Sequence, residues 1–266
     1  MGVIDFTMHW QFDSASGAFG AALGQDQYNN DARWNVTYVD SHDYAPDQNQ
    51  TQRFTGGTQT WAENLNLMFT FRGIPCLYYG SETEFQKGCK IDDGPNMPLS
   101  QTGRAYYGDA LEGSVTATGF STYSNATGTI KNTLNSTLSK HLQKLNAIRR
   151  AVPALQLGQY TTNDNYVTGG MAYIRRYTGS YTDAVTGQTS NVDSLACVAV
   201  TDGATFKNIP NGTYIDAVTG ETKQVSGGTL SVGSVGKGNM RVYVCCASGF
   251  KGISGAIGPS GQTYLK

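Results

Sequence analysis

Three polar side chains follow one of the most strand-like stretches of the sequence. The segment Tyr38-Val-Asp-Ser-His-Asp43 passes from β-forming residues to Asp40, His42 and Asp43. The carboxyl ends of parallel strands are where α/β proteins collect their active sites. A histidine there can donate a hydrogen bond to a substrate oxygen, and a carboxylate can stabilise a developing positive charge. The alternative interpretation is a capped strand end with an Asp–His pair on the surface.

A second strand-like stretch delivers polar groups in the same way. The compact apolar run Pro75–Tyr79 is followed within three residues by Glu82. Tyr79 and Glu82 are therefore expected at the end of another parallel strand. Tyr44, directly after Asp43, adds an aromatic ring beside these polar side chains. The alternative for Tyr79 and Glu82 is that they only complete hydrogen bonds where the strand ends.

The elements that must position these side chains belong to an α/β pattern over residues 1–155. Short apolar runs predict buried parallel strands, which need no strict alternation; they are Val3–Phe6, Val36–Asp40 and Pro75–Tyr79. Apolar residues repeating on one helical face predict helices over Thr60–Phe71 and Leu134–Ala151. The order strand, helix, strand, helix indicates βα units and a parallel sheet. A polar loop insertion is expected near residues 103–133.

Residues 156–247 have a different character, typical of a small antiparallel β-sandwich. Short β-rich runs are separated by clusters of Gly, Asn and Asp; these runs are Met171–Tyr177, Leu195–Thr201, Gly212–Asp216 and Met240–Cys246. Two similar segments, Asp183–Gly187 and Asp216–Gly220, indicate shared turn chemistry rather than a repeat architecture. Residues 248–266 are rich in Gly and Ser and indicate a tail or linker.

The composition excludes several classes of protein. Nineteen Lys+Arg against 20 Asp+Glu give a net charge of −1, so the chain is not a generally basic nucleic-acid binder. No stretch approaches the roughly 20 apolar residues that span a bilayer. The opening MGVIDFTMHW lacks the basic and apolar regions of a signal peptide. Five cysteines are too few for a disulfide scaffold, and their spacing fits no zinc site.

The two strand-end segments resemble motifs of the alpha-amylase family, glycoside hydrolase family 13. VDSHD at 39–43 is similar to the motif after that family's seventh barrel strand, and RGIPCLYYGSE at 72–82 to its eighth strand. VIDF at 3–6 is similar to the sixth strand, and LNAIRRAVPALQLG at 145–158 to the last barrel helix. The resemblance covers residues 2–247. It implies the C-terminal portion of a (β/α)8 barrel, followed by the β-domain.

The resemblance also implies a site that acts on starch-like α-1,4-glucans. Asp43 matches the carboxylate that stabilises the transition state of retaining hydrolysis, and His42 matches a histidine that hydrogen-bonds the reacting sugar. Tyr79 and Glu82 match positions that shape the same pocket, and Tyr44 is a further candidate for binding the sugar. Two alternatives stay open: an α-glucan transglycosylase of the same family, and a non-catalytic sugar-binding remnant.

The family pattern is incomplete in this chain. The strands that carry the family's nucleophilic Asp and acid/base Glu have no counterpart, so we expect the chain alone to be inactive. It would need the missing N-terminal barrel half, in cis or as a partner. Gly94 lies near the place of a family arginine, for which Arg104 is a candidate substitute. Calcium is common in the family, but its ligand loops lie mainly in the missing part. We therefore expect no metal or cofactor in this chain. The family resemblance also implies an extracellular location.

Overall fold

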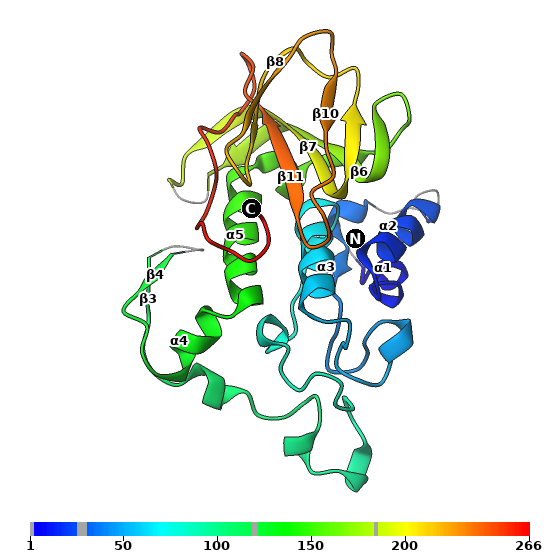
Figure 1. The fold of residues 1–266 in the computed structure, drawn as a ribbon, viewed down its shortest axis with the longest axis vertical. Helices are drawn as coiled ribbons and strands as arrows, with labels where there is room; N and C mark the ends of the chain where they lie inside the picture. Colours follow the sequence, from blue (N-terminus) through cyan, green and yellow to red (C-terminus); the bar gives the residue numbers. More distant parts are fainter. Residues whose placement is uncertain (1–2, 26–30, 119–121, 184–185) are drawn as a thin grey trace. The chain divides into compact units, whose positions relative to one another are not determined.

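The computed structural model describes residues 3–25, 31–118, 122–183 and 186–266 (Figure 1). Residue contacts divide the chain into two compact units. The first unit comprises Met1–Met68 and Gly73–Gln143, and the second comprises Phe69–Arg72 and Lys144–Lys266. Within the described ranges, no helix is long and apolar enough to cross a membrane.

The first unit is built from short helices and very short strands. In chain order these are α1 (Phe6–Trp10), α2 (Ala15–Gly24), β1 (Val36–Thr37), α3 (Thr58–Thr70), β2 (Ile74–Pro75), β3 (Thr116–Ala117), β4 (Tyr123–Ser124), α4 (Gly128–Leu134) and α5 (Thr137–Ala151). The last residues of α3 and of α5 belong to the second unit.

Three segments of the first unit run parallel, as the sequence predicts. Val36 of β1 lies opposite Ile74 of β2, and Ile4 forms a parallel bridge with Val36. The backbone N–H of Asp5 donates to the carbonyl of Val36 at 2.9 Å, and that of Cys76 donates to the carbonyl of Thr37 at 2.8 Å. These bonds bring the ends of β1 and β2 to the same edge, where the candidate residues follow.

The strands are shorter than predicted. The prediction of a strand through Phe6 is wrong, because Asp5 caps α1 by accepting a hydrogen bond from the N–H of Met8 at 3.2 Å. The predicted strand Val36–Asp40 ends at Thr37, and the predicted strand Pro75–Tyr79 is replaced by β2 at Ile74–Pro75.

Helix α3 matches the predicted helix Thr60–Phe71 to within two residues. It is buried on every side from Thr60 onwards, so it is a core helix rather than a surface helix. Two of its buried amides make hydrogen bonds to other segments: Asn64 Nδ2 donates to the carbonyl of Phe12 at 2.7 Å, and Asn66 Oδ1 lies 2.8 Å from His141 Nε2. These bonds satisfy polar groups that would otherwise destabilise the core.

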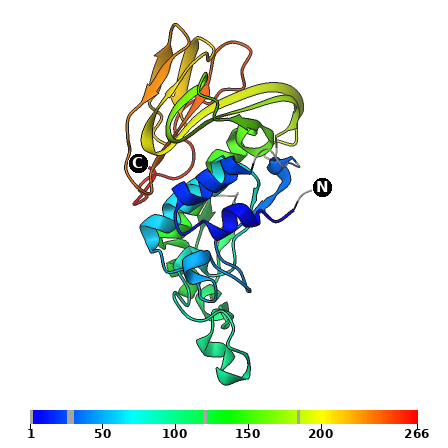
Figure 2. The ribbon, with the colours of Figure 1, turned by 90° about the vertical axis from the view of Figure 1, so that its right-hand side faces the viewer.

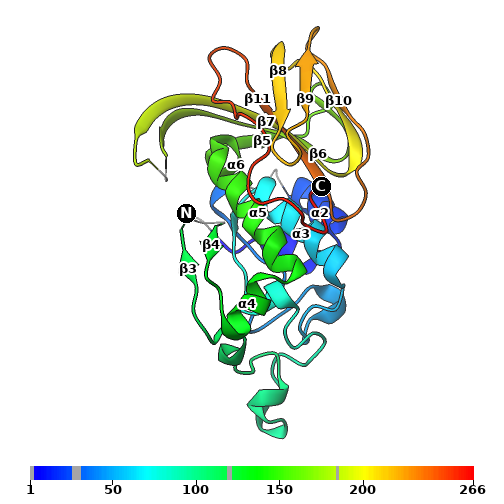
Figure 3. The ribbon, with the colours of Figure 1, turned by 60° about the vertical axis from the view of Figure 1, so that its left-hand side comes forward.

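The region expected as a polar loop holds regular structure. The strands β3 and β4 pair as a hairpin, and α4 follows them (Figure 3). The tip of this hairpin, 119–121, lies outside the described residues. The helix predicted from Leu134 begins instead at Thr137, because Ser136 Oγ accepts from the N–H of Ser139 at 3.2 Å and caps α5. Leu134 ends α4.

The second unit carries a seven-stranded antiparallel sheet, in which every predicted β-rich run lies on a strand. Its order is β5–β6–β7–β11–β8–β9, with β10 pairing on β7. The long strands β6 and β7 curve together along their length (Figure 2). A sandwich of two separate sheets stays a prediction. The bounds are α6 (Pro153–Leu157), β5 (Gln159–Thr161), β6 (Val167–Thr182), β7 (Thr189–Phe206), β8 (Gly212–Asp216), β9 (Thr222–Val225), β10 (Leu230–Val232) and β11 (Met240–Cys245).

The two similar turn sequences do share their chemistry. Gly220 N–H donates to the carbonyl of Asp216 at 2.8 Å, and Thr219 N–H donates to the Asp216 carboxylate at 3.0 Å. Gly187 N–H donates in the same way to the carbonyl of Asp183 at 2.7 Å. Residues 248–266 form no helix or strand, but their end is anchored to the same unit: the N–H of Leu265 donates to Asn239 Oδ1 at 2.9 Å.

Candidate functional site

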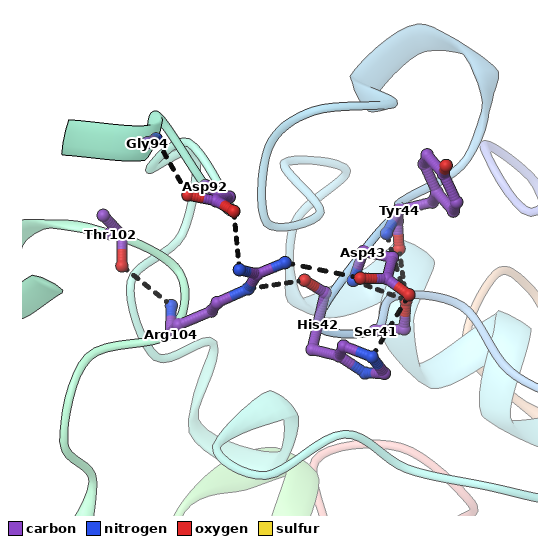
Figure 4. A network of polar contacts seen from close by, with 8 residues as sticks. All are labelled: Ser41, His42, Asp43, Tyr44, Asp92, Gly94, Thr102 and Arg104. Carbon is purple, nitrogen blue, oxygen red and sulfur yellow. Dashed lines mark hydrogen bonds and ion pairs between the residues drawn. The ribbon is translucent and has the colours of Figure 1, made fainter. Parts of the chain in front are cut away.

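A tight turn directly after the β1 segment presents His42 and Asp43 (Figure 4). Ser41 Oγ accepts the N–H groups of Asp43 at 3.1 Å and of Tyr44 at 3.0 Å. The N–H of Ser41 donates to the carbonyl of Tyr44 at 2.9 Å and closes the turn. A serine hydroxyl is suited to this local bonding, which fixes the backbone that carries the two side chains.

The predicted residues His42, Asp43 and Tyr44 come together in this turn. His42 Nε2 lies 3.1 Å from Asp43 Oδ2, and the two side chains are 66% and 50% exposed. The Tyr44 ring is 47% exposed. A donor, a carboxylate and a ring are therefore all accessible to a ligand on one turn.

Arg104 connects a distant loop to this turn. Its Nε donates to the carbonyl of His42 at 2.8 Å, and its Nη2 lies 3.3 Å from Asp43 Oδ1. Its Nη1 pairs with Asp92 Oδ2 at 2.6 Å. The N–H of Gly94, and then the charge of Arg104, hold the pKa of Asp92 below its usual value. One guanidinium thus bridges two carboxylates and a backbone carbonyl (Figure 4).

Asp40 does not join His42 and Asp43, contrary to the prediction that the three are presented together. It is buried, and its Oδ2 pairs with Arg53 Nε at 3.0 Å. Its Oδ1 accepts from Ser81 Oγ at 2.8 Å. Burial raises the pKa of Asp40, and the Arg53 charge opposes that rise. Asp40 is therefore a structural residue beneath the turn.

Arg53 joins the two strand ends, a role that its place in the sequence does not reveal. Its Nη2 donates to the carbonyl of Tyr79 at 3.0 Å, and its Nη1 donates to the carbonyl of Gly103 at 3.2 Å. Its guanidinium also lies 4.6 Å from the centroid of the Tyr78 ring. Through Asp40 and Arg53, the turn after β1 and the loop after β2 form one buried polar network.

Tyr79 and Glu82 lie together in the loop after β2, each with a partner there. Tyr79 Oη donates to the carbonyl of Ala105 at 2.9 Å. Glu82 Oε1 accepts from Tyr107 Oη at 2.9 Å, and the Tyr107 and Tyr79 ring centroids are 5.9 Å apart. These contacts match the hydrogen-bonding alternative for this pair. A role of Tyr79 and Glu82 toward a sugar stays a prediction.

An aromatic pair and a polar hollow extend the site beyond Tyr44. Trp10 packs against the Tyr44 ring at a centroid distance of 5.5 Å. Trp10 also lines an open hollow of about 500 Å³. In that hollow, Asp47 accepts hydrogen bonds from Gln11 Nε2 at 2.8 Å and from Gln50 Nε2 at 3.3 Å. Aromatic faces with fixed amides beside them are suited to bind a polyhydroxylated ligand.

Among the residues that the structure describes, no three His, Cys, Asp or Glu side chains gather where they could hold a metal ion. The expectations about calcium and cofactors stay predictions. His42 and Arg104 of this site can donate hydrogen bonds to a ligand, and the Asp43 carboxylate offers a negative charge.

Known proteins share parts of this chain's sequence and fold, although no family model matches it. A cyclomaltodextrin glucanotransferase of Paenibacillus macerans is 29% identical over 145 residues, which are 54% of this chain and 15% of that protein. An Anoxybacillus alpha-amylase has a TM-score of 0.52 at 14% identity, over 98% of this chain and 48% of its own. An alpha-amylase of Geobacillus thermoleovorans in complex with acarbose has a TM-score of 0.52 at 14% sequence identity. The match covers 91% of this chain and 47% of that alpha-amylase.

These comparisons confirm the resemblance that the motifs predict. The chain resembles a part of the alpha-amylase family, glycoside hydrolase family 13. The likeness to the solved structures concerns the fold, a mixture of helices with an antiparallel sheet that matches the C-terminal region of amylase-like proteins. The chain spans about half the length of these two solved structures and 15% of the length of the glucanotransferase.

Proposed function

We propose that this chain is part of a retaining α-glucan hydrolase of the alpha-amylase type, in which Asp43 stabilises the transition state. The observation that carries the proposal is the exposed His42–Asp43 pair on the turn after a parallel strand, held by Arg104. The fold likeness to alpha-amylases supports it, as does the sequence match with a glucanotransferase.

The chemistry of the turn suits that role. Retaining glycoside hydrolysis passes through a transition state with positive charge on the sugar ring. The Asp43 carboxylate can stabilise that charge more than it stabilises the neutral substrate, which is the condition for lowering the barrier. His42 can hydrogen-bond a hydroxyl of the same sugar. Arg104 holds both residues in place through the Asp43 carboxylate and the His42 carbonyl.

Malto-oligosaccharides are the proposed ligands. The Geobacillus alpha-amylase structure contains acarbose, and the fold of this chain resembles that protein. The Trp10–Tyr44 pair and the hollow beside it offer ring faces and amides to further sugar units. Tyr79 and Glu82 are proposed to shape the pocket from the neighbouring strand end. An extracellular location is proposed on the same resemblance.

Turnover needs groups from outside the described chain. A retaining mechanism uses two carboxyl groups about 5–5.5 Å apart, and Asp43 has the third, stabilising role. The outer parallel segments carry apolar side chains that are 44–50% exposed: Val3, Ile4 and Ile74. Parallel strands are normally covered on both faces. We propose that an N-terminal barrel half, in cis or as a separate chain, covers these side chains and supplies the carboxylate pair.

The glucanotransferase match favours a second candidate, transfer of the glycosyl group to another sugar instead of to water. Asp43 and His42 would have the same roles, because both reactions begin with the same bond cleavage and pass through transition states with positive charge on the sugar ring. The two candidates differ in the product: transfer gives cyclic or longer glucans, and hydrolysis gives maltose and short oligosaccharides.

The test is a starch assay with separated parts. The chain alone should release no maltose from soluble starch, and addition of the N-terminal barrel half as a second polypeptide should restore release. The same mixture with Asp43→Asn is the matched control and should stay inactive. Maltose release by the chain alone would contradict the proposal, as would equal activity of the Asp43→Asn mixture.

A further inference from the structure

A hollow of about 290 Å³ opens on the antiparallel sheet of the second unit. Its volume lies near the lower end of the range for small-molecule pockets, roughly 300–1,000 Å³, and suits one or two sugar rings. Its walls come from β5, from the segment before β6, from β6 and β7, and from the segment after β7. All of these elements belong to the second unit, so the hollow is a site of that unit alone.

One exposed tyrosine, Tyr166, lines the hollow on anchored backbone. Tyr160 of β5 pairs in register with Arg175, so its ring lies on the face of the sheet opposite to Ile174 and Arg176, where it packs against Phe71 at a centroid distance of 4.4 Å. Tyr166 is 43% exposed. Its carbonyl accepts from the N–H of Lys207 at 2.7 Å. A ring presented on such a fixed segment loses little conformational freedom when a ligand stacks on it.

Polar groups lie beside the Tyr166 ring. Asn208 has a positive φ of 53°, and its Nδ2 donates to the carbonyl of Asn165 at 2.9 Å. This bond holds the amide at the rim, between the residue before Tyr166 and the segment after β7. Gln159 and Thr161 of β5 add an amide and a hydroxyl to the lining. The hollow therefore combines one ring face with several neutral donors and acceptors.

The lining has no unbalanced charge. Arg176 is its one ionised side chain, and the guanidinium donates to both oxygens of Asp193, at 3.0 Å and 2.6 Å. A phosphate or carboxylate ligand would have to compete with Asp193 for this guanidinium. A cation would find no carboxylate in the lining. The chemistry favours a neutral ligand with an apolar face and many hydroxyls.

We propose that this hollow binds a neutral sugar, one or two units of an α-glucan, with the Tyr166 ring stacked on a pyranose face and the Asn208 amide bonded to its hydroxyls. The choice of an α-glucan rests on the proposed function, whereas the preference for a neutral sugar rests on the hollow alone. Such a site would hold a glucan chain through the β-unit without taking part in bond cleavage.

The test is a titration of the full, ¹⁵N-labelled chain with maltotriose, followed by amide chemical shifts. The amides of residues 159–161, 166 and 208–209 should shift together. Tyr166→Ala should weaken binding about tenfold, as expected for loss of one stacked ring, and Tyr166→Phe should retain it. Tyr177→Ala, which removes a β6 tyrosine outside the lining, is the matched control and should bind like the unchanged chain.

Asn208→Gly removes the side-chain amide and should keep the backbone conformation, because glycine readily adopts the positive φ at this position. It should also weaken binding at the hollow. The proposal would be overturned if the amide chemical shifts of residues 159–161 and 208–209 did not change under saturating maltotriose. It would also be overturned if Tyr166→Ala and the unchanged chain bound maltotriose with equal affinity. The amides of His42 and Asp43 are read in the same spectra, so failure at this hollow is distinguishable from failure of the proposed function.

Discussion

Removal of the Asp40 charge should destabilise the first unit strongly. In Asp40→Asn the side chain keeps its shape, but the Arg53 guanidinium loses its only ion-pair partner among the described residues. Both side chains are almost completely buried, at 2% and 1% exposure. Burial of an unbalanced charge after loss of one partner costs about 3–5 kcal/mol. The bonds of Arg53 to the carbonyls of Tyr79 and Gly103 remain, so we expect a loss of about 3 kcal/mol.

The double variant Asp40→Leu/Arg53→Met separates the charge from the packing. Replacement of both partners of a buried pair by apolar side chains is often nearly neutral. Here it also removes the bonds of the pair to Ser81, to the N–H of Phe54 and to the carbonyls of Tyr79 and Gly103, which at roughly 1 kcal/mol each give an expected cost of about 4 kcal/mol. The double variant should thus be no more stable than Asp40→Asn, although it buries no unbalanced charge.

The assay is urea unfolding followed by tryptophan fluorescence. All three tryptophans, Trp10, Trp34 and Trp61, belong to the first unit, so the signal reports that unit without interference from the β-sheet. A shift in midpoint at constant slope gives the change in free energy of unfolding. A loss below about 1 kcal/mol in Asp40→Asn, or a double variant as stable as the unchanged chain, would refute the reasoning.

Three further predictions concern the first unit. Burial lowers the pKa of His141 from 6.5 to about 3, so the unfolded state binds a proton first as pH falls below about 6.5. His141 should thus contribute about 2.5 kcal/mol to the loss of stability from pH 7 to 4.5, and urea unfolding of His141→Gln should show a loss smaller by that amount. In the enzyme formed by this chain with the N-terminal barrel half, Arg104→Gln should lower kcat about 10- to 100-fold with little change in KM, and Asp92→Asn should lower kcat less. If both variants changed KM by the same factor and left kcat unchanged, this prediction would be contradicted. Gly73→Ala places a Cβ 2.5 Å from the Asn35 carbonyl at φ +81°, and should cost more than about 1 kcal/mol in the same urea assay.

The sequence was most informative where local chemistry decides the structure. The turn at Asp216–Gly220 depends on bonds between neighbours, so its chemistry was predictable from its residues. The β-rich runs of the second unit also lie on strands as predicted. Helix α2 was missed because Gly17, Gly20 and Gly24 interrupt any apolar stripe. Its one signal is Ser14, whose Oγ caps the helix by accepting from the N–H of Gly17.

The candidate site was predictable in part. His42, Asp43 and Tyr44 are neighbours in sequence and form one turn, so the motif was sufficient to place them together. Arg53 was not predictable, because a buried ion pair between loops depends on long-range packing. Asp40 was wrongly expected beside His42, since sequence spacing does not show which side chains of a strand end face the core.

The most direct test of the central claim is to measure turnover by the Asp43→Asn variant of the enzyme formed by this chain with the N-terminal barrel half. This variant removes the charge and keeps the size of the side chain. Because Asp43 is proposed to act mainly in the transition state, kcat on maltoheptaose should fall at least about 100-fold. The Kd for maltotriose should change only a few-fold. An unchanged kcat, or a loss that appears in Kd and not in kcat, would contradict the account.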